Sequence, residues 1–343
     1  MKVLNVGDKK KSGVLFHQND KKILSLLCYN VRLPLSKIAR ILNLSRQSVE
    51  YRIKSMEKYH LIPGSRTVIN IKKLGYHSYH YFLNVRTRES EKELIERCRN
   101  SDDVNALISY SGKMGYELSI MAKTPEDANE FFSSLLENLE IGASFPCILL
   151  NPIKASILPG LIPDKIPKIK NIKNDTSFSR QFESEIKNYK IDSKDKKILY
   201  ILSQDAQKSI SSIGRAVGLT KDAVSYRIKN LIKSKYIIQF RPVIDYSVLD
   251  LTIQAVLIKT NKKSENVKKK FSDYLIGSNS VLWATEILGN WDYIFYVISK
   301  NQDEIHNFIK NLKDTFEDYV HSYEILFAYQ EHKYSFMTSS MGK

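Results

Sequence analysis

Basic, amide and hydroxyl side chains gather at two places in the sequence where their spacing suits the reading of nucleic acid. The first place is Ser45-Arg46-Gln47-Ser48, and the second, 175 residues later, is Thr220-Lys221-Asp222-Ala223. A hydroxyl directly before a helix can cap its first turn. That turn can enter the major groove of DNA, where arginine and glutamine recognise guanine and adenine edges. The helix N-terminus and its cap can also donate to phosphate.

Both places continue as helices with one apolar and one polar face. The apolar stripes are Val49, Ile53 and Met56 in the first helix, and Val224, Ile228 and Leu231 in the second. We predict that the polar faces contact DNA through Ser45, Arg46, Gln47, Ser48, Tyr51, Arg52 and Lys54, and through Thr220, Lys221, Asp222, Ser225, Tyr226, Arg227 and Lys229. Two β-wings are expected to follow, at Ile62 to Asn70 and Ile237 to Asp245, with Arg66 and Arg241 near their tips as further DNA contacts.

Shorter helices must position each of these recognition helices. In the first copy a helix is expected from Asp20 to Leu27, and Ser36 can cap the next one. Asn43 is a plausible left-handed turn residue after that helix, and its counterpart Gly218 suits the same role better. The order of elements is the helix-turn-helix pattern.

The chain contains an internal duplication. Residues 20–75 align with residues 195–250 without a gap, and about 21 of 56 positions are identical. Both copies open with Asp-Lys-Lys-Ile-Leu and close with Arg-x-Val-Ile. The recognition helices nevertheless differ in their first turn, so we predict non-identical half-sites on DNA. The acidic Asp222 makes the second copy the weaker DNA-binding candidate.

The region after each copy is expected to form a βαββαβ unit. The first unit is predicted from Tyr79–Thr87, Glu89–Asn100, Val104–Ser111, Tyr116–Lys123, Pro125–Leu139 and Phe145–Ile153. The second is predicted from Ile253–Thr260, Ser264–Ile276, Val281–Leu288, Asp292–Ser299, Gln302–Asp318 and His321–Ala328. This order implies a ferredoxin-like antiparallel sheet with both helices on one face.

The predicted fold class is α+β, with two winged helix-turn-helix modules alternating with two ferredoxin-like modules. The expected domains are a basic N-terminal tail (1–19), the first winged helix-turn-helix (20–75), the first ferredoxin-like domain (76–153), a linker (154–190), the second winged helix-turn-helix (191–250), the second ferredoxin-like domain (251–336) and a tail (337–343). The linker contains Pro159, Pro163 and Pro167 and is expected to be partly extended and partly disordered.

The positive charge is concentrated in one type of module. The chain carries a net charge of +16, of which residues 20–75 hold +9 and residues 195–250 hold +5, while residues 76–150 hold −5 and residues 251–343 hold 0. Charge confined to the helical modules indicates that they meet a polyanion, and double-stranded DNA is the expected partner. The alternative is a protein-interaction module with a basic face.

Several other classes of function find no support in the sequence. No phosphate-binding glycine loop or histidine metal motif occurs, and the three cysteines form no CxxC pair. No apolar run approaches the ~18–20 residues that span a bilayer. We therefore expect no catalytic residue, metal, cofactor or membrane association, and a cytoplasmic location.

The repeated motifs resemble those of the Lrp/AsnC family of bacterial and archaeal regulators. They are the Asp-x-x-Ile-Leu helix, the Ser-x-Ile-Ala/Gly-Arg helix, the Val-x-Tyr-Arg-Ile-Lys helix and the Arg-x-Val-Ile strand, and the βαββαβ unit is similar to that family's amino-acid-metabolism regulatory (RAM) domain. The resemblance implies a DNA-binding transcription regulator whose effector is often an amino acid. A usual member has one copy and dimerises through the RAM domains. The tandem form is thus expected to make an intramolecular pseudo-dimer and to self-associate as a homodimer.

One family feature is carried over onto this sequence. The turn between the second and third sheet strands in the family usually reads Gly-x-x-Asp. The second copy matches with Gly289-Asn290-Trp291-Asp292, whereas the first has Gly112-Lys113-Met114-Gly115. The resemblance therefore implies an effector site at the second turn, and the alternative is that Gly289 and Asp292 only form a tight hairpin.

An enzymatic alternative also stays open. Siroheme decarboxylases of alternative haem synthesis resemble Lrp/AsnC proteins and occur as paired or fused copies. Against this alternative, the positive charge lies on intact-looking recognition helices, and the sheet modules show no arginine and histidine cluster for tetrapyrrole carboxylates.

Overall fold

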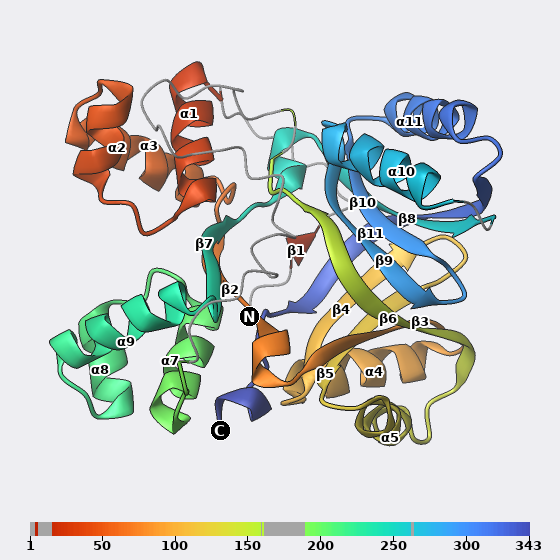
Figure 1. Cartoon of the computed structure of the whole chain (residues 1–343), viewed down its shortest axis with the longest axis horizontal. Coiled ribbons are helices and arrows are strands. Elements are labelled where there is room, and N and C mark those ends of the chain that lie inside the picture. The colour runs from red at the N-terminus through yellow and green to blue at the C-terminus, as the bar shows by residue number, and fades with distance from the viewer. Residues whose placement is uncertain (1–3, 6–15, 159, 161–188, 262–263) are drawn as a thin grey trace.

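Two groups of three helices form one end of the molecule. The computed structural model describes residues 4–5, 16–158, 160, 189–261 and 264–343, so most of the predicted N-terminal tail and linker lies outside the described residues. The helices are α1 (Gln18–Tyr29), α2 (Leu35–Leu42) and α3 (Arg46–Lys58) in the first copy, and α7 (Ser193–Gln204), α8 (Ile210–Val217) and α9 (Lys221–Lys233) in the second. Both predicted helix-turn-helix arrangements are confirmed (Figure 1).

The turns between the second and third helices form as predicted, but one predicted cap is wrong. Asn43 and Gly218 both adopt left-handed conformations, with φ of 55° and 65°. Ser36 does not cap α2, because that helix begins at Leu35, two residues earlier than a cap at Ser36 implies, with Pro34 at the N-cap position and no side-chain cap. The fixed φ of proline favours a helix start at this point.

Both predicted wings form strands, but neither copy folds back on itself as a β-hairpin. Strand β2 (Gly64–Ile69) follows the first helix-turn-helix and pairs with β7 (Ile237–Val243), which follows the second. The pairing is antiparallel and sets Arg66 opposite Arg241. A hairpin needs two strands joined by a short turn. Each copy supplies only one strand here, so the duplicate copy provides the partner.

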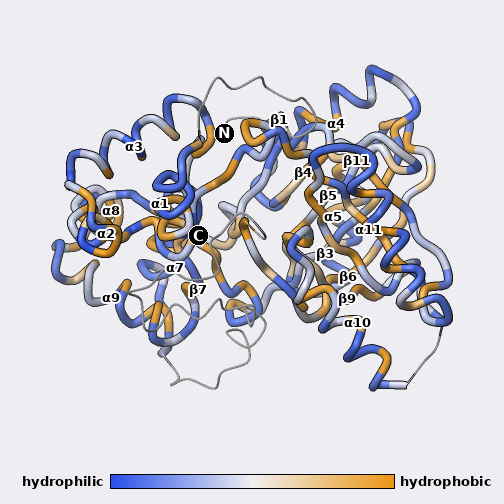
Figure 2. The backbone as a smooth tube through the Cα atoms, turned by 90° about the horizontal axis from the view of Figure 1, so that it is seen from above, coloured by the Kyte–Doolittle hydropathy of each residue, from blue (hydrophilic) through white to orange (hydrophobic). Residues whose placement is uncertain are grey.

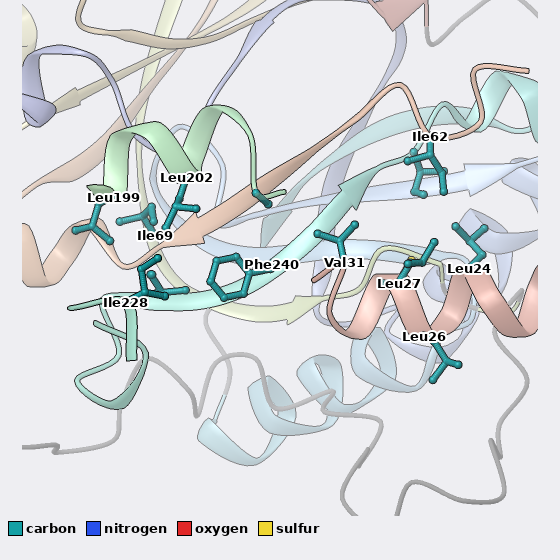
Figure 3. Packing of buried hydrophobic residues seen from close by; sticks show 14 of the residues in the cluster. Leu24, Leu26, Leu27, Val31, Ile62, Ile69, Leu199, Leu202, Ile228 and Phe240 are labelled. Carbon is teal, nitrogen blue, oxygen red and sulfur yellow. The ribbon is translucent and has the colours of Figure 1, made fainter. Parts of the chain in front are cut away.

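The two strands of this ribbon are exchanged between the copies. Strand β2 packs on α7 and β7 packs on α1, so Ile69 lies beside Leu199 and Leu202 while Phe240 lies near Val31 (Figure 3). The backbone N–H of Val31 donates to the carbonyl of Phe240 at 3.0 Å. All these side chains belong to a single buried cluster. The exchanged strands therefore hold the two helix-turn-helix modules in a fixed relative position.

The two βαββαβ units have the predicted order of elements. The first contains β3 (His77–Val85), α4 (Arg88–Asn100), β4 (Val104–Ser111), β5 (Tyr116–Ala122), α5 (Pro125–Leu135) and β6 (Ile141–Ala155). The second contains β8 (Thr252–Thr260), α10 (Glu265–Gly277), β9 (Val281–Gly289), β10 (Tyr293–Ser299), α11 (Gln302–Thr315) and β11 (Val320–Tyr334). Short 3-10 turns follow the ribbon strands at Ile71–Leu74 (η1) and Tyr246–Leu249 (η2).

The strands of the two units join into one closed ring. Within the units the strand orders are β6-β3-β5-β4 and β11-β8-β10-β9, which is the ferredoxin-like arrangement. The last strand of each unit also pairs with the second strand of the other, as β6 with β9 and β11 with β4. The short strand β1 (Leu4–Asn5) adds to β11. The result is a β-barrel made from both copies.

The helices of the units cover the outside of this barrel. In Figure 1, α10 and α11 lie above the strands and α4 and α5 below them. Each pair buries one apolar face against its own sheet, and a third apolar cluster fills the interior from strands of both units. Alternating hydrophilic and hydrophobic stretches along the helices in Figure 2 agree with this one-sided burial.

The last residues of the chain, which the sequence analysis gave as a tail, pack against the rest of the protein. Met337 and Met341 are almost fully buried and belong to the cluster under the helix-turn-helix modules. The 3-10 turn η3 (Ser340–Gly342) packs on α7. Among the helices that the structure describes, none has the length and apolar character needed to cross a bilayer.

Candidate nucleic-acid interface and central cavity

The recognition helices α3 and α9 begin at the hydroxyl caps that the sequence predicted. Ser45 Oγ accepts a hydrogen bond from the N–H of Ser48 at 3.0 Å, and Thr220 Oγ1 accepts one from the N–H of Ala223 at 3.2 Å. The inner faces are anchored by Val49 and by its counterpart in α9, both fully buried. The caps fix each first turn with its remaining N–H groups open to a ligand.

The first turns and outer faces of both helices are exposed. Tyr51 is 76% exposed and Tyr226 is 67% exposed, which is unusual for aromatic side chains that have an apolar core nearby. The other exposed side chains at these two faces are Ser45, Arg46, Gln47, Lys54, Thr220, Lys221, Asp222 and Lys229. Ser48 and Ser225 are partly buried. The predicted DNA contacts in the first turns thus lie together on the accessible surface of each helix.

Arg52 and Arg227 are already engaged within their own modules. Arg52 Nη1 lies 2.7 Å from Asp20 Oδ1 of α1. Arg227 Nη1 lies 2.9 Å from Asp192 and 3.0 Å from Asp195, and the hydrogen bond to Asp195 raises the pKa of Arg227. These ion pairs tie each recognition helix to the start of its first helix. Their loss would therefore change the module as well as any contact with phosphate.

Arg66 and Arg241 do not stand at wing tips, so their assignment as DNA contacts is wrong. Both lie in the middle of the β2–β7 ribbon and turn toward the barrel. Arg66 Nη2 pairs with Glu331 Oε1 at 3.1 Å, and its guanidinium stacks on Tyr334. The Arg241 guanidinium lies 4.5 Å from the ring centre of Phe336. Strand exchange removes the hairpin that would have carried these arginines outward.

Asp292 and Gly289, at the two ends of the predicted effector turn, are both engaged in contacts within the protein. The Asp292 carboxylate accepts from the N–H and hydroxyl of Thr260 and pairs with Lys259 at 3.1 Å. Gly289 lies so close to β6 that an added Cβ would come 2.7 Å from the carbonyl oxygen of Pro146. The hairpin alternative explains both residues, and ligand binding by Gly289, Asn290, Trp291 and Asp292 stays a prediction.

A cavity of about 380 Å³ separates the β2–β7 ribbon from the mouth of the barrel. Its walls come from β2, β7 and the two 3-10 turns on one side and from strands of both βαββαβ units on the other. It could not be predicted from the sequence, because its lining residues are scattered over the whole chain. Both exchanged arginines, Arg66 and Arg241, line it.

A buried polar cluster lies at the inner end of the cavity. Glu117 accepts hydrogen bonds from Tyr110 at 2.6 Å, from Tyr296 at 2.9 Å and from Nδ1 of His80 at 2.7 Å. Burial acts to raise the pKa of Glu117, but the hydrogen bonds and the charge of His80 lower it overall. The only sign of this cluster in the sequence is a charged residue, Glu117, inside an otherwise apolar strand. The cluster joins the two copies, because Tyr296 belongs to β10.

The cavity brings an arginine and histidine group together after all. Arg66, Arg241 and His80 line the same space, although no such cluster was evident in the sequence. Within the described residues, no group of three or more histidine, cysteine, aspartate or glutamate side chains has a geometry that could hold a metal ion. The cavity thus offers cations and hydroxyl groups to a ligand.

Comparison with known proteins shows the family of the chain. An AsnC-type helix-turn-helix domain matches residues 18–57 and again residues 191–232. The HTH-type transcriptional regulator LrpA of Pyrococcus abyssi is 33% identical over 139 residues, which are 40% of this chain and 98% of LrpA. LrpA of Pyrococcus horikoshii is 31% identical over 142 residues, which are 41% of this chain and all of that protein. The chain belongs to the Lrp/AsnC family of transcription regulators.

A solved structure shares the tandem architecture. The siroheme decarboxylase NirDL matches 94% of this chain and 94% of its own length, with a TM-score of 0.59 and 11% sequence identity. A second structure of NirDL, in complex with an iron-uroporphyrin III analogue, has a TM-score of 0.60. At this identity the likeness shows a common fold.

Proposed function

We propose that this chain is a transcription regulator that binds double-stranded DNA in a sequence-specific manner through α3 and α9. The observation that carries the proposal is a pair of capped recognition helices whose first turns present Arg46, Gln47 and Lys221 to solvent. Arginine and glutamine at a helix N-terminus can read base edges, while the cap and first-turn N–H groups can hold phosphate.

The locked ribbon supports simultaneous binding by both helices. Because β2 packs on the second module and β7 on the first, the two modules keep one relative orientation. Two recognition helices held in this way are expected to address half-sites about one DNA turn (~34 Å), or a multiple of it, apart. Their different first turns favour non-identical half-sites.

The proposed domain division assigns DNA binding to 20–75 and 191–250 and assembly to 76–153 and 251–336. The pairing of β6 with β9 and of β11 with β4 supports an intramolecular pseudo-dimer of RAM-type domains. Association of two whole chains as a homodimer, and modulation by a small effector such as an amino acid, are further parts of the proposal. Size-exclusion chromatography with light scattering tests the homodimer.

The decisive experiment is selection from a random duplex-DNA pool with the full chain, followed by sequencing of the retained DNA. Enrichment of two half-sites at helical-turn spacing is expected. Affinity for the selected site is expected to fall by roughly 10³-fold or more between 50 and 200 mM salt if six or more phosphates are contacted. Lys92→Ala removes one surface charge from the exposed face of α4, away from the recognition helices, and serves as the control variant in this experiment. Salt-sensitive binding without any enriched motif would contradict sequence specificity.

A siroheme-decarboxylase-like enzyme is the second candidate function. The tandem fold shared with NirDL and the His80–Glu117 pair beside two arginines favour it. Titration of the full chain with siroheme, followed by absorption spectroscopy, tests this candidate separately from DNA binding. A saturable shift of the Soret band that His80→Ala abolishes would support the enzyme. An unchanged spectrum would exclude this candidate function.

A further inference from the structure

A hydrogen-bonded chain of serine, histidine and glutamate side chains lies at the mouth of the barrel. Ser78 Oγ lies 3.0 Å from Nε2 of His80, and Nδ1 of His80 lies 2.7 Å from Glu117 Oε1. Ser119 Oγ lies 3.0 Å from both Ser78 Oγ and His80 Nε2. Such distances suit a nucleophile, its base and the group that orients the base. The order hydroxyl, imidazole, carboxylate is that of the catalytic triad of serine hydrolases.

Two neighbouring strands position these side chains. Ser78 and His80 lie two residues apart on β3, so their side chains share one face of the sheet. The pairing of β3 with β5 sets His80 opposite Ser119 and Phe82 opposite Glu117. Side chains on paired strands are held more precisely than side chains on a loop.

The carboxylate of Glu117 determines the direction of the hydrogen bonds. Burial acts to raise the pKa of Glu117, but the hydrogen bonds from His80, Tyr110 and Tyr296 lower it overall. An ionised carboxylate can only accept, so Nδ1 of His80 carries a proton and donates it to Glu117. The Nε2 atom of a neutral His80 is then an acceptor, which is the state that takes a proton from a hydroxyl group.

Ser78 carries the hydroxyl that a substrate can reach. Ser78, His80 and Glu117 all line the cavity of about 380 Å³, and Ser78 is partly exposed. Ser119 is fully buried, so its hydroxyl supports Ser78 and His80 instead of meeting a substrate.

The second copy shows that the fold does not require this cluster. Strands β8 and β10 pair in the same register as β3 and β5. The positions equivalent to Ser78, His80, Glu117 and Ser119 are Ile253, Ala255, Ile294 and Tyr296. Apolar side chains therefore occupy three of the four positions without loss of the sheet. Burying polar groups costs free energy that only good hydrogen bonding offsets, so the cluster in the first copy indicates a use beyond packing.

The rest of the cavity indicates the class of substrate. Trp283, Leu149 and Ile253 are among its apolar lining residues and suit an apolar acyl group. The guanidinium of Arg241 lines the same space, and positive charge there stabilises an oxyanion and the acid that hydrolysis releases. A volume of about 380 Å³ lies at the lower end of the range for small-molecule sites, so a long acyl chain does not fit.

We propose that Ser78, His80 and Glu117 form a serine-hydrolase site that cleaves small carboxylic esters. Ser78 Oγ attacks the carbonyl carbon of the ester while its proton moves to Nε2 of His80. The C–O bond to the alcohol breaks, and Nε2 gives the proton to the leaving oxygen. Water then attacks the carbonyl carbon of acyl-Ser78 and gives a proton to Nε2. The acyl–oxygen bond breaks, Ser78 Oγ takes this proton back, and the carboxylic acid leaves.

Glu117 is the positioning residue of this site. It holds the imidazole in the tautomer whose Nε2 faces Ser78, and it stabilises the imidazolium that forms when the proton arrives. Ester and water are the only reactants, and acid and alcohol are the only products. The activity does not depend on the proposed DNA binding.

The first test measures hydrolysis of 4-nitrophenyl esters by the full chain at neutral pH, followed by the absorption of 4-nitrophenolate. The acetate and butyrate esters are expected to be cleaved, and the palmitate ester roughly tenfold or more slowly because of its length. Ser78→Ala should lower kcat/KM for the butyrate ester by roughly 10²-fold or more. Ser133→Ala, which removes an exposed hydroxyl from α5, is the matched control and should change it by less than about twofold.

The second test identifies the nucleophile without any variant. A fluorophosphonate probe exchanges its fluoride for the Oγ atom of an activated serine, and peptide mass spectrometry locates the adduct. The adduct is expected on Ser78 of the wild-type chain, and His80→Ala should abolish it. This measurement decides the question even if Ser78→Ala or His80→Ala does not fold. A wild-type chain without an adduct on Ser78, or equal hydrolysis by the wild type and a folded Ser78→Ala, would overturn the proposal.

The role of Glu117 is tested by the separation of kcat from KM. Glu117→Gln should lower kcat by roughly 10²-fold or more and leave KM within about twofold, because the amide favours the wrong tautomer of His80. A merely structural side chain would change the thermal unfolding midpoint without this separation. An unchanged kcat in a folded Glu117→Gln would overturn the assignment of Glu117.

Discussion

The two helix-turn-helix copies share their architecture but differ in the side chains that they show to solvent. Both recognition helices begin at a hydroxyl cap, and both keep an arginine paired with the first helix. The exposed first turns read Arg46-Gln47-Ser48 in one and Lys221-Asp222-Ala223 in the other. Residues that hold the module together have thus been kept within this chain, while those that could read DNA have changed. The DNA contacts proposed for the two copies therefore differ in charge and in hydrogen-bonding groups.

The largest expected effect concerns the first recognition helix. The double substitution Arg46→Ala with Gln47→Ala should lower affinity for the selected duplex by roughly 10²-fold, because each bidentate base contact contributes about 1–3 kcal/mol. The matched change in the second copy, Lys221→Ala with Asp222→Ala, should lower affinity less than about fivefold, since it removes one charge of each sign. Fluorescence anisotropy at fixed salt measures both. Equal losses would show that the copies read DNA alike.

A second comparison concerns the caps of the middle helices. Ser209 caps α8 through the N–H of Ser212 at 3.1 Å, whereas Pro34 gives α2 no side-chain cap. Ser209→Ala should lower the free energy of unfolding by about 1 kcal/mol, the typical value of a lost cap. Pro34→Ala should change it by no more than about 0.5 kcal/mol. Urea denaturation followed by circular dichroism would reveal the difference, and a larger loss for Pro34→Ala would contradict it.

The left-handed turns give a contrast in which the two substitutions have opposite signs. Asn43→Gly should raise the free energy of unfolding by about 0.5 kcal/mol, since glycine adopts positive φ without steric cost. Gly218→Ala should lower it by about 1 kcal/mol, although a Cβ there would meet no atom within 4 Å. Backbone strain alone then accounts for the loss. Equal unfolding midpoints for the wild type and Gly218→Ala would disprove this explanation.

The smallest expected effect is a difference in acid sensitivity. The backbone N–H of Asp195 and the Arg227 guanidinium lower the pKa of Asp192 in the folded chain. A lowered folded pKa means that the stabilisation is present above the unfolded pKa, about 3.9, and is lost as the pH falls through the folded value. Asp192→Asn should therefore flatten the decline of Tm between pH 5 and pH 3. A scan of Tm against pH with an unchanged slope would show that the carboxylate contributes nothing.

Local features of the fold could be predicted because neighbouring residues determine them. The caps at Ser45 and Thr220, the left-handed Asn43 and Gly218 and most strand bounds depend on side chains a few positions apart. Strand β4 from Val104 to Ser111 agrees to the residue. The internal duplication also allowed two modules of each kind to be predicted, since each motif occurs twice.

Features that join the two copies could not be predicted from local patterns. Strand β11 extends six residues beyond its predicted end at Ala328, through a polar stretch that pairs with β4 of the other unit. In the sequence, β2 and β7 look like two separate wings, because neither strand shows that its partner is the other. The Glu117 cluster likewise depends on Tyr296, which lies 179 positions away in the other unit.

The closed ring of strands limits how one chain can meet another. Each of the eight long strands from β3 to β6 and from β8 to β11 pairs with two others, and β6 and β11 do so over different halves of their length. An open sheet edge would invite a further molecule to add a strand. In the proposed homodimer a second copy can also recognise side chains, and Tyr323, Phe327 and Tyr329 on β11 are exposed for such a contact. A homodimer formed through this face would depend on surface complementarity, which substitutions can tune one residue at a time.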